Sequence, residues 1–188
     1  MASSTAPSLL HIDDDTLAIC AASDFEAFAE LYRRFLPTVY RFVRSQTPDD
    51  ATAEDLTAQV FFNALSSAGS FRADGSYRSW LYRIAHNVVV SWRGRRDRSV
   101  TVEHLPDEED PSPSPASRAI SKDALTEVWK KVAELPAAQR EVVALRYAED
   151  LTTEEIARAT RRSRGAVRIL LHRARARLRG SLQGNDLL

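Results

Sequence analysis

Nine arginines and no acidic residue lie between Ala157 and Gly180, near the C-terminal end of the chain. The imbalance is local, because the 188 residues carry 26 basic and 26 acidic side chains and no net charge. Guanidinium groups bind the phosphates of nucleic acids, and they can donate two hydrogen bonds to the edge of a guanine. The run therefore favours a polyanionic partner over the blander interpretation, a solvated helix face.

Arginines and aromatic rings are interleaved between Phe71 and Arg98, a segment with seven arginines and two acids. On a single-stranded nucleic acid, the cations would meet phosphates while bases stack on the rings. The alternative is that the rings belong to the hydrophobic core. For Tyr77 and Trp80, at the start of a helical pattern beside a glycine-containing loop, both interpretations stay open.

The residue types that catalyse reactions or hold metals do not cluster in the sequence. The histidines are far apart, and none lies four residues from another or from the single Cys20; they are His11, His86, His104 and His172. The glycine motifs that hold nucleotide phosphates do not occur either. We therefore expect no enzymatic activity, no metal site and no cofactor.

The segments that must position these groups have helical patterns. Apolar residues recur three or four positions apart, which predicts helices with one buried side. In the first hundred residues the stripes are Phe25, Phe28, Leu31, Tyr32 and Phe35; then Leu56, Val60, Phe61 and Leu65; then Leu81, Ile84, Ala85 and Val88. We find no alternating pattern typical of a strand, so the predicted fold class is all-α.

Helix boundaries follow from capping residues and prolines. Ser23 and Glu26 have the spacing of a capping box, which predicts a helix start at Ser23. Pro37 is expected to kink that helix or to end it. The next helix is expected to open at Asp50 or Thr52.

A helix-turn-helix is predicted in the C-terminal part. A capping box at Thr152 opens a short helix, Thr153–Ala159, and Ser163 can cap a second helix, Arg164–Arg179. Five residues have the spacing to pack the two helices together: Ile156, Ala157, Val167, Leu170 and Leu171. The second helix of such a motif enters the major groove of DNA. An ordinary helical hairpin with a basic surface is the alternative.

The stretch Thr101–Ser117 has four prolines and five acids, so we expect an extended linker rather than packed structure. It divides the chain into two small helical domains, residues 1–98 and 118–188, with the linker at 99–117. No apolar run is long enough to span a membrane, and the N-terminus has no secretory pattern. With one cysteine, a reducing cytoplasmic setting is expected.

In its motifs the chain resembles the extracytoplasmic-function (group 4) sigma factors of bacterial RNA polymerase, within the sigma-70 family. Phe71–Arg96 resembles regions 2.3 and 2.4, including WLYRIAHN at Trp80–Asn87. The other matches, in order, are Phe25–Arg44 with region 2.1, Ala53–Leu65 with 2.2, Leu135–Tyr147 with 4.1 and Leu151–Leu178 with 4.2.

The resemblance implies a factor that binds core polymerase, places region 4 on the −35 duplex and melts the −10 element with region 2. By matched position, the expected core-polymerase residues are Glu54, Asp55 and Gln59. Those expected at the −10 element are Asn63, Tyr77, Trp80, Arg83 and Asn87. Those expected at the −35 element are Arg146, Arg164, Arg168, His172 and Arg173. The family also makes an anti-sigma factor a candidate partner.

The chain departs from the family pattern in its helix-turn-helix. The turn usually reads apolar, glycine, apolar, whereas here it is Thr160, Arg161 and Arg162. Ile169 and Leu170 replace residues that are often polar or basic, and one of them could contact a thymine methyl. Two rival functions remain: a stand-alone helix-turn-helix regulator that never touches polymerase, and a protein-interaction module whose arginines hold an acidic partner.

Overall fold

The computed structural model describes residues 9–72, 75–100 and 122–183, and every regular element in these ranges is helical, which confirms the all-α prediction. We call 9–100 the N-terminal half and 122–183 the C-terminal half. The predicted linker falls almost wholly outside the described residues. Within the described residues no helix is long and apolar enough to cross a membrane.

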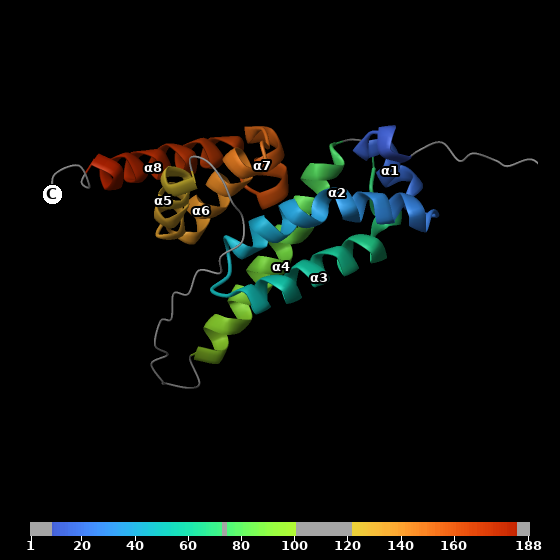
Figure 1. Cartoon of the computed structure of the whole chain (residues 1–188), viewed down its shortest axis with the longest axis horizontal. Helices are drawn as coiled ribbons and strands as arrows, with labels where there is room; N and C mark the ends of the chain where they lie inside the picture. Colours follow the sequence, from blue (N-terminus) through green and yellow to red (C-terminus); the bar gives the residue numbers. More distant parts are fainter. Residues whose placement is uncertain (1–8, 73–74, 101–121, 184–188) are drawn as a thin grey trace, which may run out of the picture.

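Four helices form the N-terminal half, and the long helices α2 and α3 lie beside α4 (Figure 1). They are α1 (Asp14–Cys20), α2 (Phe25–Arg44), α3 (Asp50–Ser66) and α4 (Tyr77–Val100), with single 3-10 turns at Leu9–His11 and Ala68–Ser70. Their core is fully buried and includes Leu31, Val39, Phe42, Val60 and Leu81.

Helix α2 has its N-cap one residue later than predicted, and of the two outcomes expected at Pro37, an end of the helix is excluded. Asp24, not Ser23, is the N-cap, since its carboxylate accepts from the Glu26 amide at 2.9 Å. Pro37 lies inside the helix, which continues to Arg44. Proline removes one backbone donor, but buried Phe35 and Val39 on either side anchor both helical segments to the core. Tertiary packing therefore outweighs the local cost.

At the starts of helices α3 and α4, free backbone amides donate hydrogen bonds to carboxylates. Asp49 accepts from the Thr52 amide at 2.7 Å, so α3 opens at Asp50 as predicted. Asp15 of α1 accepts from the Tyr77 amide at 2.5 Å, which ties the start of α4 to another helix. The apolar stripe predicted for this helix ends at Val88, whereas the helix continues to Val100.

The C-terminal half contains α5 (Lys122–Ala133), α6 (Ala137–Val143), a wider helical turn at Ala144–Ala148, α7 (Thr153–Thr160) and α8 (Arg164–Gln183). The capping box at Thr152 and Glu155 is confirmed, with both reciprocal hydrogen bonds present. Ser163 caps α8 by accepting from the Ala166 amide at 3.1 Å. Buried Ile156 and Val167 pack α7 and α8 together, so the helix-turn-helix forms as the spacing predicts.

The two halves are in contact, because α7 lies against α4 (Figure 1). Arg161, which ends α7, adopts a left-handed backbone with φ of 53°. This is the position at which the family pattern usually has glycine, the residue that adopts such a conformation without strain. The turn therefore takes a left-handed conformation at Arg161 although the residue there is not glycine.

Candidate nucleic-acid interface

One side of α4 carries three of the predicted −10 residues in a row. Trp80, Arg83 and Asn87 are three and four residues apart, so they share one side of the helix. Arg83 and Asn87 are exposed and Trp80 is half-buried. The side chains therefore form a stripe that combines an aromatic ring, a cation and an amide.

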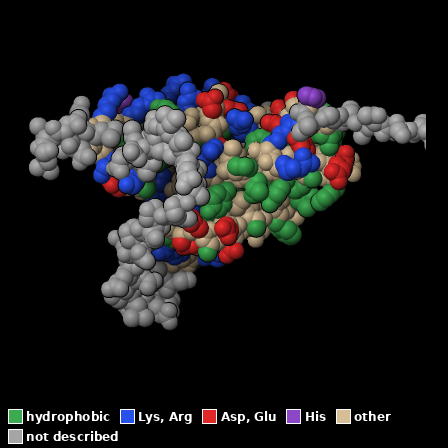
Figure 2. Space-filling view, viewed as in Figure 1, with side chains coloured by type: hydrophobic (Ala, Val, Ile, Leu, Met, Phe, Trp, Pro, Cys, Tyr) green, Lys and Arg blue, Asp and Glu red, His purple; other side chains and the backbone are tan. Residues whose placement is uncertain are grey.

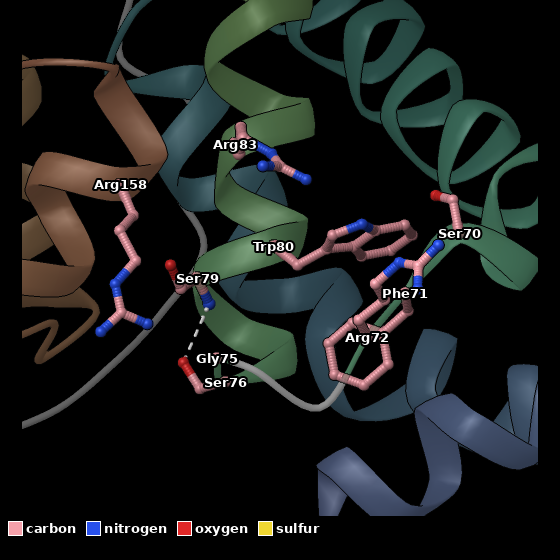
Figure 3. A pocket seen from close by; sticks show the side chains of 9 residues that line it. All are labelled: Ser70, Phe71, Arg72, Gly75, Ser76, Ser79, Trp80, Arg83 and Arg158. Atoms are coloured by element: carbon pink, nitrogen blue, oxygen red, sulfur yellow. Dashed lines mark hydrogen bonds between the residues drawn. The ribbon is translucent and has the colours of Figure 1, made fainter.

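A hollow of about 610 Å³ lies beside the first part of this stripe (Figure 3). Trp80 and Phe71 form one wall, with Arg72 and Arg83 around them. The Trp80 and Phe71 ring centroids are 5.8 Å apart in an edge-to-face arrangement. Arg158, on α7, faces the same hollow from the C-terminal half. The hollow is therefore lined by an aromatic wall and by cationic side chains.

Tyr77 supports this wall from within the core. Its ring is 2% exposed and stacks on Trp80 with centroids 5.6 Å apart. Burial raises the pKa of Tyr77 far above its ordinary value. Its hydroxyl is buried without a hydrogen-bond partner among the described residues. Of the two interpretations that the sequence left open, the core one holds for Tyr77, and its ring offers no face to a base in this structure.

A second hollow, of about 520 Å³, lies between α3 and α4. It brings together Asn63 of α3 and Asn87 of α4, which the sequence analysis had placed in one group. Gln59 lines it too, and its amide nitrogen donates to Asn63 Oδ1 at 2.8 Å. The structure therefore places Gln59 beside the predicted −10 residues, although its matched position in the family predicts a contact with the polymerase.

A different side of α3 exposes acidic and apolar residues together. Asp55, Phe62 and Leu65 follow helical spacing on that side, and Phe62 is 66% and Leu65 42% exposed. The predicted buried stripe was wrong for Leu65, since Ala64 is buried in its place. Phe62 was missed, although only one of two adjacent phenylalanines can face a helix core. Figure 2 shows acidic side chains near the start of α3 and apolar ones along the surface beyond it.

The exposed side of α8 carries Arg168, Ile169, His172 and Arg173. Ile169 is 53% exposed, whereas Leu170 is half-buried and packs on the core, which separates the two residues that the sequence left unresolved. Basic side chains cover much of this part of the surface (Figure 2). The predicted −35 residues on α8 thus share a surface with an apolar side chain.

The other two predicted −35 residues have partners within the C-terminal half. Arg164, at the start of α8, lies 3.3 Å from a carboxylate oxygen of Glu154. Arg146 precedes α7 and donates to the Leu151 carbonyl at 2.9 Å. Arg164 is exposed and Arg146 half-buried, so Arg146 is the less accessible of the two.

Two buried carboxylates join the halves. Glu141 of α6 lies 2.5 Å from His86 Nδ1 of α4 and 2.7 Å from Arg162 Nη1. Burial alone would raise the pKa of Glu141, but the hydrogen bonds and charges of His86 and Arg162 outweigh burial and hold the pKa below its ordinary value. Because these partners are far apart in sequence, no local pattern could have found them.

Glu149 is the second of these carboxylates. It accepts from the Tyr82 hydroxyl at 2.5 Å and from Arg41 at 3.3 Å, both in the N-terminal half. Burial and the Glu149 charge raise the pKa of Tyr82 far above its ordinary value, so this phenol stays a donor. Within the described ranges no three histidine, cysteine or acidic side chains are placed to hold a metal ion.

Comparison with known proteins gives the class to which this geometry belongs. The model of sigma-70 region 2 matches residues 31–99, and that of sigma-70 region 4 matches residues 125–178. The chain belongs to the sigma-70 family.

Its relatives specify the branch of the family. The chain is 33% identical over 156 residues to the ECF RNA polymerase sigma factor BldN of Streptomyces coelicolor, covering 81% of this chain but 59% of BldN. It is 31% identical over 176 residues to the ECF RNA polymerase sigma factor SigD of Mycobacterium tuberculosis, covering 90% and 83%. It is thus an extracytoplasmic-function RNA polymerase sigma factor, which confirms the resemblance and does not favour a stand-alone regulator.

Solved structures of two similar proteins have the same fold. One is CnrH in complex with the cytosolic domain of CnrY, with a TM-score of 0.68, 25% identity and coverage of 91% of this chain and 97% of CnrH. The other is the sigma factor RpoE with the anti-sigma factor NepR from Bartonella quintana, with a TM-score of 0.74, 26% identity and coverage of 83% and 96%.

Proposed function

We propose that this sigma factor reads a promoter at two separate sites, with α4 on a melted −10 strand and α8 on the −35 duplex. The observation that carries the proposal is the Trp80, Arg83 and Asn87 stripe, flanked by two hollows. Capture of an extruded base needs an aromatic wall and a group that both donates and accepts hydrogen bonds. Trp80 supplies the wall and Asn87 the amide.

The two hollows suit different parts of a single strand. Arg72 and Arg83 stand beside the Trp80 wall, where cations can meet phosphates while a base stacks. Asn63 and Asn87 converge across the groove between α3 and α4, where their amides can reach the hydrogen-bonding edge of a base. Tyr77 serves by holding Trp80 in place.

On α8, the exposed arginines and His172 suit the edges and phosphates of duplex DNA. Arg168 is the base-reading candidate, because it lies near the helix N-terminus, which a helix-turn-helix presents to the major groove. Ile169 adds an apolar contact suited to a thymine methyl. Arg164 and Arg173 lie on either side of Arg168 and Ile169 in the sequence. Arg146 is less accessible, and would serve both the fold and a DNA contact.

The polymerase would bind α3 through the side that carries Asp55, Phe62 and Leu65. A large exposed apolar residue with charged neighbours is typical of an interface that a partner buries. Glu54 lies on the same helix and is exposed. Gln59 belongs to the neighbouring groove with Asn63.

The division into residues 1–98, 99–117 and 118–188 is part of this proposal, and it is supported by one family match on each side of the linker. The chain would act in the cytoplasm, where polymerase and promoter are found, and would have no catalytic activity of its own. An anti-sigma factor is a proposed partner, because the similar RpoE is bound to one.

Run-off transcription with bacterial core polymerase on genomic fragments tests the proposal. We expect the full chain to co-purify with core polymerase and to produce transcripts with defined start sites. A Phe62→Ser, Asp55→Arg double variant that remains folded should lose both, whereas Glu134→Gln, at an exposed position of the other half, should lose neither. Binding to DNA without any binding to core polymerase would refute the proposal.

A further inference from the structure

A cavity of about 330 Å³ lies where the C-terminal end of α2 meets the C-terminal half. In Figure 1 that end of α2 faces the C-terminal half, and α2 contacts the turn at Ala144–Ala148. The walls are mainly apolar, and come from both halves: Phe42 from α2, Trp129 and Val132 from α5, and Ala144 and Ala148 from the turn after α6. A cavity of this size is at the lower end of the range for small-molecule sites, about 300–1,000 Å³.

Arg140 brings a charge into this apolar cavity. Its Nη1 donates to the Ala133 carbonyl at 2.6 Å, but its Nε is buried without a hydrogen-bond partner among the described residues. In the part of the chain that the structure describes, no acidic side chain pairs with it. Burial, with Arg93 nearby, lowers the pKa of Arg140 below its ordinary value. The guanidinium is therefore half-buried without a countercharge.

The other two arginines at the cavity are already neutralised. Arg41 pairs with Glu149, and Arg44 pairs with Asp50. Arg140 is therefore the cation to which an incoming anion would bind. A half-buried charge costs free energy unless it is paired, and unfilled apolar walls lack packing partners. One molecule with an anionic head and an apolar body would remove both costs.

We propose that this cavity binds a small amphipathic carboxylate of the medium-chain fatty acid type, with its carboxylate on Arg140 and its chain between Phe42 and Trp129. The occupant follows from two features of the site, the guanidinium of Arg140 with its unpartnered Nε and the apolar walls around it.

Such a ligand would also act on the contact between the halves. Its site exists only while α2 lies beside α5 and the turn after α6. We call this arrangement, in which the two halves are in contact, the closed arrangement; ligand binding stabilises it by mass action. The free ligand concentration would then set how readily the halves separate. An effect of the ligand on promoter reading rests on the proposed function, with the halves separating to read the promoter. Binding of the ligand to the cavity does not rest on the proposed function.

Calorimetric titration of the full chain with decanoate, below its micelle-forming concentration and without polymerase or DNA, tests the site. We expect saturable binding of one molecule per chain. Decanol, which lacks the carboxylate, should bind at least tenfold more weakly. Arg140→Gln should weaken decanoate binding at least tenfold, and Ala148→Leu, which fills the cavity, should abolish it. Arg161→Gln, away from the cavity, should change nothing.

The comparison of decanoate with decanol uses the unaltered chain, so it stands even if a variant fails to fold. Absence of saturable binding, uptake of several molecules per chain, or equal affinity for decanoate and decanol would each overturn the proposal. None of these outcomes depends on transcription, so failure here and failure of promoter recognition are distinguishable.

Discussion

His86 Nδ1 and Glu141 Oε1 belong to different halves of the chain and lie 2.5 Å apart in a buried contact. Arg162, from the turn before α8, holds the other oxygen of Glu141 at 2.7 Å. The carboxylate thus connects the helix that carries the −10 stripe with the helix-turn-helix. Because an unpaired buried charge is costly, this contact makes the closed arrangement depend on the ionisation of Glu141.

The first prediction concerns pH. The pKa of Glu141 lies below its ordinary value of 4.5 in the folded chain, so its carboxylate binds fewer protons folded than unfolded. Its contribution to stability is present above the ordinary pKa and is lost as the pH falls through the lower folded pKa. Urea unfolding between pH 7 and 3.5 should show that Glu141→Gln costs most near neutrality and progressively less in acid.

Glu134→Gln is the matched control, since Glu134 is exposed and its ion pair among the described residues is with Lys131, three residues away. It should leave the pH dependence nearly unchanged. If Glu141→Gln lowered the free energy of unfolding by the same amount at every pH down to 3.5, the charge of Glu141 would not be what stabilises the contact.

The second prediction concerns the Tyr82 hydroxyl, which donates to the buried Glu149 at 2.5 Å across the halves. Tyr82→Phe keeps the ring, which packs edge-to-face on Phe42, and removes only this donor. We expect a loss of about 1–3 kcal/mol in the free energy of unfolding, because a buried acceptor loses a partner. Tyr40→Phe, whose hydroxyl makes a long 3.4 Å bond to Asp50 within one half, should cost less. Equal losses in urea denaturation would contradict this account.

The limits of sequence reasoning are visible in these contacts. Local signals correctly predicted the Thr152 capping box and the packing of Ile156 on Val167, because both depend on residues close in the chain. They left open whether Pro37 ends or kinks α2, and the helix continues through it because packing on both sides of the proline outweighs the local preference. They could not find Glu149, whose partner Tyr82 lies 67 residues away.

The candidate site was predictable to a similar degree. Helical spacing grouped Trp80 with Asn87, and the structure keeps both on one side of α4. The same spacing could not tell which ring would be buried, and Tyr77 is the one in the core. Nor could it separate Gln59 from Asp55, because that separation depends on where α4 packs against α3.

The third prediction tests the left-handed backbone at Arg161, which has φ of 53°. Both Arg161→Gly and Arg161→Ala remove the same charged side chain, so their difference isolates the backbone. Glycine adopts this conformation without the penalty that alanine has, and we expect Arg161→Gly to be the more stable variant by about 1 kcal/mol. Thermal unfolding of the pair provides the measurement, and a more stable Arg161→Ala would be inconsistent with the turn geometry.

The fourth prediction assigns different roles to two arginines of α8. Arg168→Ala should cost roughly 1–3 kcal/mol on the cognate −35 duplex and reduce discrimination at one or two base pairs. Arg177→Ala, near the other end of the helix, should weaken all duplexes equally and less. Binding to a duplex panel at two salt concentrations distinguishes them. A uniform loss for Arg168→Ala would make Arg168 a phosphate contact.

Ile169 gives a sharper version of this test, because its predicted target is one methyl group. Replacing a thymine of the −35 element with deoxyuridine removes that methyl and should cost about 0.8 kcal/mol with the unaltered chain. With Ile169→Ala the same replacement should cost almost nothing. A loss of equal size in both proteins would mean that Ile169 does not contact the methyl.

The central claim is that the α4 stripe reads a melted −10 strand, and the preference profile of Asn87→Ala tests it most directly. Polymerase carrying this variant would be assayed by run-off transcription on a library of single −10 substitutions, with permanganate footprinting of the opened strand. We predict that preference is lost at one −10 position while the others are unchanged, and that Trp80→Ala instead slows opening on every promoter. An Asn87→Ala protein that opens promoters with the unaltered preference profile would contradict the account.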